Sequence, residues 1–449
     1  MSNKINSIKE LCELIWHLED KYNLLEYEVD NVKVWQYLRM EVYYLMAKEL
    51  GILEQRNKSQ QSISVLMKNS LSLLKNLFVA NPFLTFNRQK DVLIFTHNRS
   101  KKIDDKFEDI YTQSLIRDLK NSNQSFLCFE KPFQGKHIRE KDSNVKYLDF
   151  ILSASILYGK LYRIKDKDSL GVIKKVEKEI KNATANSINL ISLFKKNIGR
   201  YKLGNKLYLR LFKKIKPQIV YSVASYSYLG DMISAAKVLG IKTIELQHGV
   251  VSKYHMGYSF TKKQSLLYYS DVFYSWGDFW NKSVANAFSE VQNNGFQYFR
   301  DMSKIYRNAV KENKILIISQ AALGGKIMNE TLKLINKFSE FQILYKLHPE
   351  EYDMYKKYPS YSKLASYKNL VFLEKCNLYE IMSKSKIQIG VFSTALYEGL
   401  ELSCNTFLYN LNGVEYMQDL IDSEYAKLLT VGIDISLIEF KKKSVNNFF

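Results

Sequence analysis

The chain has 449 residues, of which 46% are apolar and 25% charged. This composition is typical of a folded protein of two domains and excludes a disordered or fibrous one. A formal net charge of +20 favours partners that carry phosphate, and the four scattered cysteines, with no Cys-x-x-Cys pair, argue against a zinc cluster and suit a reducing compartment.

The first 86 residues are expected to form a helical N-terminal segment. Apolar residues recur at three- and four-residue spacing in 8–25 and 34–53, as along the buried face of a helix. Short apolar runs then predict buried strands at 91–100 and 125–130, and the basic segment from 160 to 216 is expected to be mostly helical.

From residue 217 onward, strands and helices alternate strictly, which is the pattern of a parallel sheet covered by helices. The expected strands are 218–223, 242–246, 271–276, 314–319, 341–347, 370–374, 387–392 and 406–411. The expected helices are 229–240, 326–339, 350–367, 378–383 and 394–402, with a polar helical stretch at 286–311 between the two series.

These elements predict an α/β fold with two doubly wound, Rossmann-like domains that face a cleft. The first domain is expected at 87–295, with a basic helical insertion at about 150–216, and the second at 296–449. Ligands of open α/β sheets bind beyond the carboxyl ends of the strands. The residues that directly follow each strand are therefore the candidates for function.

Polar side chains follow the predicted strands in both halves. Three of the six histidines, His97, His248 and His348, lie at such positions. That is more than scattered surface histidines would give, so these positions are the first indication of a functional site.

Ser393 precedes the predicted helix 394–402 at the N-cap position. Its hydroxyl, that of Thr394 and the free N–H groups of the first turn form an anion site of the kind that phosphates use. Glu398 lies one turn later on the same face, where a carboxylate can accept both hydroxyls of a ribose. A serine and a threonine at this place are also an ordinary helix cap.

His348 ends another strand, and the proline after it suits the first turn of a helix. An imidazole N–H can point at a phosphate there, with Lys346 adding positive charge; the alternative is that His348 only caps the helix. Gln320 ends the first strand of this half, and a pair of glycines beginning at Gly324 either offers N–H groups to a pyrophosphate or turns the chain.

A strand followed by His-Pro and a strand followed by Ser-Thr-x-x-x-Glu-Gly resemble motifs of bacterial GT-B glycosyltransferases that make surface polysaccharides. The chain is similar in particular to the sialyltransferase and Kdo-transferase families, which use CMP-activated sugars. The Gln-His-Gly turn is similar to that of capsule-synthesis enzymes and, more loosely, of CDP-glycerol transferases. The match covers about 242–411, and the acidic catalytic motif of the sialyltransferases is not evident in the N-terminal half.

The resemblance implies that the C-terminal domain binds a nucleotide sugar and the N-terminal domain its acceptor. The nucleotide and its phosphate are then held by the residues after the C-terminal strands: His348, Ser393, Thr394, Glu398, Lys346, Gln320 and Gly324.

His248 is our candidate for the base that takes the proton of the acceptor hydroxyl, since imidazole suits this task at neutral pH. It is otherwise a phosphate or acceptor ligand, or a structural histidine in a tight turn. His97 and Glu245 are reserve candidates for the base. The same loop supplies candidates that hold the acceptor or the donor sugar: Gln247, Lys253, Tyr254 and His255.

No metal site is predicted, because the Asp-x-Asp spacing at 166–168 lies in a solvated charge run. Helix ends, hydroxyls and basic side chains can neutralise the leaving phosphate instead. We expect metal-independent transfer, with the nucleotide sugar as substrate and no resident cofactor.

The segment 193–217 carries nine lysines or arginines and no acid, with its apolar residues on roughly one helical face. This pattern is typical of a helix that lies on an anionic membrane; the alternative is a helix packed in the core with a solvated back. No apolar run is long enough to span a bilayer. We expect a cytoplasmic protein, peripheral at the inner face of the cytoplasmic membrane.

The sequence as a whole predicts an inverting glycosyltransferase that moves a CMP-activated acidic sugar, of the sialic acid or Kdo type, to a bacterial surface glycan or lipid-linked glycan. The alternatives are a CDP-glycerol or CDP-ribitol phosphotransferase of the same fold, a nucleotide-sugar epimerase, and a basic nucleic-acid-binding protein. No nucleic-acid-binding motif supports the last of these, and no nucleic acid is expected as a partner.

Overall fold

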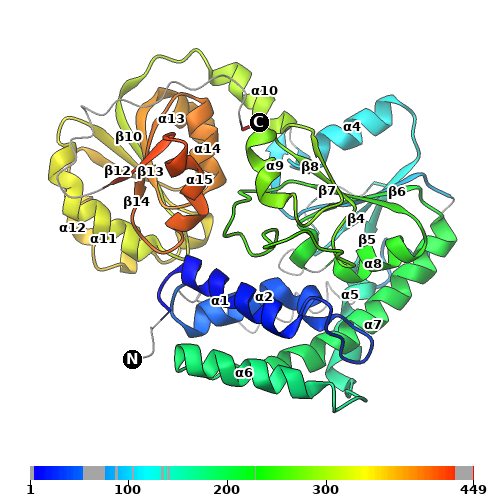
Figure 1. Ribbon diagram of the computed structural model, residues 1–449. Helices are drawn as coiled ribbons and strands as arrows, with labels where there is room; N and C mark the ends of the chain where they lie inside the picture. The colour runs from blue at the N-terminus through cyan, green and yellow to red at the C-terminus, as the bar shows by residue number, and fades with distance from the viewer. Residues whose placement is uncertain are drawn as a thin grey trace.

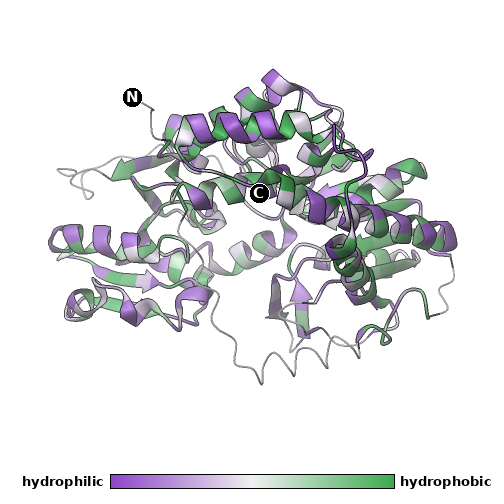
Figure 2. Ribbon diagram, turned by 90° about the horizontal axis from the view of Figure 1, so that it is seen from below, coloured by the Kyte–Doolittle hydropathy of each residue, from purple (hydrophilic) through white to green (hydrophobic). Residues whose placement is uncertain are grey.

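The computed structural model describes residues 5–53, 76–85, 89–103, 106–132, 136–137, 139, 142–227, 229–429 and 448–449. It has two lobes, each built on a parallel sheet, and a pair of N-terminal helices that lies beside both (Figure 1). In Figure 2 the strands of the sheets are largely apolar, while the helices carry both polar and apolar residues. This is the expected pattern when helices cover both faces of a sheet.

The N-terminal lobe holds a seven-stranded sheet in the order β5-β4-β1-β6-β7-β8-β9, and every neighbouring pair is parallel. Its strands are β1 (Val92–Phe95), β4 (Phe126–Glu130), β5 (Val145–Tyr147), β6 (Ile219–Val223), β7 (Lys242–Leu246), β8 (Val272–Ser275) and β9 (Glu290–Asn293). The strand order reverses between β1 and β6, so the sheet is doubly wound, with its switch point at that place.

The C-terminal lobe repeats the arrangement with six parallel strands in the order β12-β11-β10-β13-β14-β15. They are β10 (Glu312–Ile318), β11 (Gln342–Lys346), β12 (Leu370–Leu373), β13 (Ser385–Gly390), β14 (Asn405–Tyr409) and β15 (Ala426–Leu429). The prediction of an α/β fold with two doubly wound domains, the GT-B arrangement, is confirmed. The domain boundaries in the sequence stay a prediction.

Three strands at the sheet edges, β5, β9 and β15, were not predicted. For two of them the reason lies in the sequence: β5 has only three residues, and β9 has the sequence EVQN with mostly exposed side chains. An edge strand needs few apolar residues, so the apolar pattern that reveals central strands is weak there.

The helices of the N-terminal lobe are α4 (Gln113–Asn121), α5 (Asp149–Leu161), α6 (Leu170–Thr184), α7 (Leu190–Ile215), α8 (Gly230–Val238) and α9 (Asp278–Val284). The next helix, α10 (Gln297–Tyr306), packs on Tyr379 of the C-terminal lobe through Tyr298 and Phe299. An antiparallel hairpin, β2 (Ser100–Ile103) with β3 (Lys106–Asp109), follows β1. The C-terminal lobe has α11 (Gly324–Leu334), α12 (Tyr361–Ala365), α13 (Leu378–Lys384), α14 (Thr394–Glu401) and α15 (Gln418–Asp422).

The single helix predicted at 350–367 is wrong. Two 3-10 turns, Pro349–Glu351 and Tyr355–Lys357, stand there before the short α12. The cause is Pro359, because a proline removes an N–H and pushes the preceding residue out of the helical region. Tyr358 is accordingly extended, with a ψ of 136°.

The N-terminal helices α1 (Ile8–Tyr22) and α2 (Val34–Glu49) join the two lobes. The backbone N–H of Ile8 donates to Glu415 of the C-terminal lobe at 3.1 Å, and Arg39 donates to the carbonyl of Met256 in the N-terminal lobe. Inside the pair, the buried Arg39 is paired with Glu19 at 2.6 Å. The helices therefore help to fix how the lobes are placed.

The basic segment forms one continuous helix, α7, of 26 residues. The interpretation of its apolar face as a membrane surface is wrong, because that face packs inside the protein: Phe194, Ile198, Tyr208, Phe212 and Ile215 are buried. Its glycines serve close packing, since a Cβ on Gly199 would lie 2.4 Å from Cβ of Tyr162. Among the residues that the structure describes, no helix is long and apolar enough to cross a membrane.

Candidate active site

The carboxyl ends of the two sheets meet where the lobes touch. Gly249 follows β7, and a Cβ built on it would lie 3.7 Å from Oγ1 of Thr394, the first residue of α14. Arg99, which follows β1, attracts the carboxylate of Glu398 from the other lobe. The junction thus brings together residues that are far apart in the sequence, among them the predicted His248, Thr394 and Glu398.

His248 lies between two phenols. Nε2 is 3.4 Å from Oη of Tyr226, and Nδ1 is 3.4 Å from Oη of Tyr258. Burial lowers the pKa of His248 well below its ordinary value, and the neighbouring His97 and His255 lower it further. The ring is therefore neutral near pH 7, which is the form that can accept a proton.

Glu245 is linked to His248 through the hydroxyl of Tyr258. It is fully buried, and it accepts hydrogen bonds from Oη of Tyr258 at 2.6 Å and from the backbone N–H of Ser225 at 3.2 Å. Because the hydrogen of Tyr258 goes to Glu245, the phenol oxygen can only accept from Nδ1–H of His248. Nε2 then carries the lone pair, which faces the hydroxyl of Tyr226 at 3.4 Å and can take a proton.

Burial also raises the pKa of the Glu245 carboxyl to about 7. A carboxyl group enclosed in this way has no surface to offer an acceptor. Among the candidate bases, Glu245 is therefore placed to position His248 rather than to contact a substrate.

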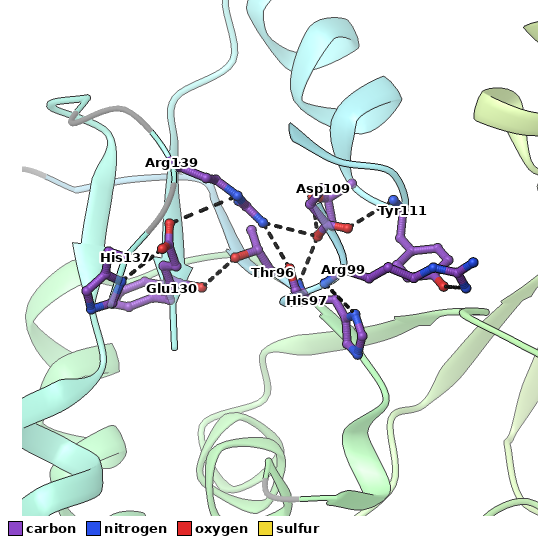
Figure 3. A network of polar contacts seen from close by, with 10 residues as sticks. Thr96, His97, Arg99, Asp109, Tyr111, Glu130, His137 and Arg139 are labelled. Carbon is purple, nitrogen blue, oxygen red and sulfur yellow. Dashed lines mark hydrogen bonds and ion pairs between the residues drawn. The ribbon is translucent and has the colours of Figure 1, made fainter. Parts of the chain in front are cut away.

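His97, the other reserve candidate, lies beside His248 with 5.8 Å between the ring centroids. Its Nδ1 accepts the backbone N–H of Arg99 at 3.0 Å, so Nε2 carries the hydrogen of the neutral ring. The backbone N–H of His97 donates to Asp109 at 2.8 Å, and Arg139 donates to its carbonyl at 3.0 Å. Figure 3 shows this network, with the His97 ring pointing away from Arg139.

The four predicted loop residues are placed differently from one another. Gln247 holds the turn, because its amide donates to the carbonyl of Gly249 at 2.9 Å and accepts from the N–H of Trp276 at 2.8 Å. Tyr254 packs on Trp16 of α1, and the neighbouring Lys253 is exposed.

His255 is the loop residue nearest to the site. Its ring lies 5.5 Å from that of Tyr226 and 6.4 Å from that of Tyr416 in the C-terminal lobe. Nδ1 has no hydrogen-bond partner among the described residues. Burial lowers the pKa of His255 to about 4, so this ring is also neutral.

Ser393 is the N-cap of α14, as predicted, and its hydroxyl accepts the N–H of Ala395 at 3.2 Å. Gln320 approaches the same turn, because its amide nitrogen donates to the carbonyl of Phe392. The other amide atom, Oε1, is buried without a partner among the described residues. The start of α14 is thus bordered by polar groups from β10 and β13.

His348 caps the turn that follows β11, which was the simpler of the two interpretations. Its Nδ1 accepts the N–H of Glu350 at 3.2 Å, so Nε2 carries the hydrogen of the neutral ring and is a donor. The buried Glu351 accepts the N–H of His348 at 2.8 Å and the hydroxyl of Ser319 at 3.0 Å. This carboxylate joins the ends of β10 and β11.

Gly324 and Lys346 are occupied by contacts within the lobe. A Cβ on Gly324 would lie 1.9 Å from Oε1 of Glu351, so this glycine makes room for a carboxylate. The ammonium of Lys346 contacts the carbonyl of Leu347 and lies 3.2 Å from Oη of Tyr352. Neither contact supports a role in binding a pyrophosphate.

Glu398 lies buried at the junction and accepts the hydroxyl of Tyr379 at 3.1 Å. Burial raises its pKa, against the attraction of Arg99 and Lys101 from the other lobe. The glycine beside it, Gly399, makes room for Gln388, whose Oε1 would lie 2.0 Å from a Cβ there.

Five residues near the site were not predicted from the sequence: Arg99, Lys101, Tyr226, Tyr258 and Tyr379. Arg99 lies two residues after His97. It is found if the candidates include the third and fourth residues after the strand. The tyrosines carry no local signal, because the chain has 32 of them. Among the described residues, no group of three or more histidine, cysteine or acidic side chains could hold a metal ion.

No family model matches the sequence, and no curated protein does. Among solved structures, the chain is similar to UDP-GlcNAc 2-epimerase of Methanocaldococcus jannaschii in complex with UDP-GlcNAc and UDP, with a TM-score of 0.44 and 11% identity over 76% of this chain and 89% of that one. It is similar to MurG of Acinetobacter baumannii, with a TM-score of 0.42 and 13% identity over 76% and 86% of the two chains.

A third structure is α,α-trehalose 6-phosphate synthase of Burkholderia multivorans, with a TM-score of 0.41 and 9% identity over 75% and 88% of the two chains. Our assignment of the fold rests on the strand order of the two sheets.

Proposed function

We propose that this protein is a glycosyltransferase that moves a sugar from a nucleotide to an acceptor hydroxyl with inversion and without a metal ion. The observation that carries the proposal is that Thr394, at the N-terminus of α14, lies close to the turn that presents His248: a Cβ on Gly249 would be 3.7 Å from its hydroxyl oxygen. A phosphate site and a neutral imidazole then lie on opposite sides of one junction. Transfer from a nucleotide sugar requires both.

The C-terminal lobe takes the nucleotide in this proposal. The first-turn N–H groups of α14 and the hydroxyl of Thr394 bind the phosphate, and Nε2–H of His348 donates to a further phosphate oxygen. Glu398, held by Tyr379, accepts the ribose hydroxyls. The charge that develops on the leaving phosphate is met by these donors.

The N-terminal lobe activates the acceptor. The acceptor oxygen forms its bond to the anomeric carbon as the bond from that carbon to the phosphate oxygen breaks, and the bonding electron pair leaves with the phosphate. The acceptor proton goes to Nε2 of His248. Tyr258 and Glu245 hold the ring in the tautomer that leaves this nitrogen available.

For the donor we propose a CMP-linked acidic sugar. Support comes from Arg99 and Lys101, two cations on the N-terminal side of the junction that face Glu398. A sugar carboxylate is a suitable partner for an arginine. The acceptor in this proposal is a glycan or a lipid-linked glycan.

A thermal-shift series tests the proposal. CMP, CDP, UDP and GDP are compared on the wild type and on Ser393→Ala, with Ser366→Ala, outside the site, as the control. We expect one nucleotide, CMP, to raise the melting temperature of the wild type and the control, and less so that of Ser393→Ala. If none of the four nucleotides shifts the wild type, the assignment is wrong. A response to CDP alone would favour the polyol phosphotransferase.

A further inference from the structure

The exposed side of α5 is apolar. Ile156, Leu157, Tyr158 and Leu161 keep 40%, 61%, 42% and 72% of their surface accessible. At 100° per residue, these four side chains and Lys160 cover the outer half of the helix. The inner side is fixed on α7, since a Cβ on Gly159 would lie 2.4 Å from the carbonyl oxygen of Lys196.

A hollow adjoins this face at Ile156. It encloses about 530 Å³, part of it open to solvent, and it is lined by Glu41, Ile156, Leu193, Lys196, Asn197 and Arg200. A narrow second cavity shares Glu41 and Arg200 with it and continues to Ser225 and Tyr226. Tyr226 in turn contacts His248. The two cavities are therefore neighbours, and Tyr226 at the inner one lies beside the candidate base.

Arg200 is the positively charged residue between the two cavities. It lines both cavities and acts on the carboxyls of Glu41 and Asp231. Lys196 lines the outer hollow with it and also acts on Glu41. Two cations thus stand against one carboxylate in the lining of the outer hollow, so an anionic group is the complementary ligand.

The surface around the mouth is also basic. Lys160 lies within the apolar face of α5, Arg163 and Lys165 follow the helix, and Lys195 lies on α7, all of them exposed. Apolar side chains surrounded by lysine and arginine are the pattern of a surface that rests in an anionic bilayer. This face belongs to α5, and it is distinct from the face of α7 that packs in the core.

We propose that the outer face of α5 docks on an anionic membrane and that the hollow at Arg200 receives the phosphate of a membrane-borne amphiphilic acceptor. The acceptor role rests on the proposed glycosyltransferase function. The chemistry recognised is an aliphatic chain with a phosphate headgroup.

The docking surface is tested by flotation with vesicles. The wild type is expected to float with vesicles that contain phosphatidylglycerol and not with pure phosphatidylcholine. Leu157→Gln with Leu161→Gln should abolish flotation, whereas the control pair Ile305→Gln with Val310→Gln, which removes two similarly exposed apolar residues near α10, should float like the wild type. Absence of wild-type flotation, or equal flotation of both pairs, would refute the surface.

The headgroup site is tested with dodecyl phosphate as the probe, below its micelle concentration. Saturable binding measured by tryptophan fluorescence is expected for the wild type, and Arg200→Gln should weaken it about tenfold or more, since a charge-assisted hydrogen bond is lost. Lys213→Gln, at the far end of α7, should bind like the wild type. The idea is refuted if inorganic phosphate or dodecyl maltoside binds as well as dodecyl phosphate, or if Arg200→Gln changes nothing.

These two experiments use neither a nucleotide nor sugar transfer, so they fail independently of the nucleotide series. An Arg200→Gln protein that keeps the nucleotide response is folded, which separates loss of the headgroup site from loss of structure.

Discussion

Two histidines near the carboxyl edge of the seven-stranded sheet have opposite charge states. His137 lies between two carboxylates, with Nδ1 2.9 Å from Glu130 and Nε2 2.8 Å from Asp149. Burial alone would lower its pKa, but the hydrogen bonds to Asp149 and Glu130 raise it to about 9. His248 lies between two phenols, and its pKa is lowered well below the ordinary value by burial.

The difference shows that the hydrogen-bond partners of an imidazole determine its charge, and the charge determines its role. The charged His137 is stacked on Tyr147 with 3.5 Å between centroids. It joins the end of β4 to the start of α5 through both nitrogens; Figure 3 shows the bond to Glu130. The neutral His248 has a phenol at a long 3.4 Å from each nitrogen, and the residue after it, Gly249, lies near Thr394 of the other lobe. We infer that the first residue holds the lobe together and that the second performs chemistry.

The largest effect that would sharpen this contrast is expected for His248→Gln. Loss of a general base lowers the rate of transfer by about 10²- to 10⁴-fold, while nucleotide binding by the other lobe is kept. The measurement is the release of nucleotide from the nucleotide sugar over time. A variant with wild-type turnover would break the comparison, because His248 would then be structural as well.

The next largest effect is expected for His137→Gln, and it concerns stability. The substitution leaves the buried Asp149 without its cation and Glu130 with Arg139 alone, at 4.0 Å. Breaking a buried ion pair in this way costs about 3–5 kcal/mol. Urea unfolding measures the loss, with the exposed His17→Gln on α1 as the control. An unfolding midpoint equal to that of the control would show that the network contributes nothing.

The raised pKa of His137 also predicts a pH dependence of stability. A histidine that binds its proton more tightly in the folded state contributes fully below its unfolded pKa of about 6.5 and loses that contribution as the pH rises through the folded value of about 9. Stability of the wild type should therefore fall across this window. In His137→Gln the fall should be smaller; an identical profile in both proteins would contradict the assignment.

A smaller effect is expected for Tyr258→Phe, which removes the hydroxyl group between Glu245 and His248. Loss of one positioning hydrogen bond should lower kcat about tenfold with little change in KM for the nucleotide sugar. Tyr221→Phe, on β6 of the same sheet, serves as the control. An increase in KM at constant kcat would indicate that Tyr258 binds a substrate and does not orient His248.

The smallest effect is expected for Ser393→Ala. Loss of an N-cap costs about 1 kcal/mol of stability, and the affinity for the nucleotide should fall by a few-fold because the helix N-terminus keeps its N–H groups. Isothermal titration with the stabilising nucleotide measures this. An unchanged affinity would separate the cap from the phosphate site.

The central strands and the residues at their ends could be predicted because buried parallel strands are continuous apolar runs with a polar stop. His97, His248 and Ser393 were found in this way. The contrast between His248 and His137 could not be predicted, since Glu130, His137 and Asp149 are brought together only by the pairing of β4 with β5 and the start of α5. The sequence also does not indicate which face of the basic helix α7 is covered by α5.

The central claim is that both sheet edges face one ligand, and hydrogen exchange with and without the stabilising nucleotide sugar tests it most directly. The account predicts slower exchange both at the start of α14 and in the turn of Gln247 and His248. Protection confined to one lobe, or found only along α7, would contradict it.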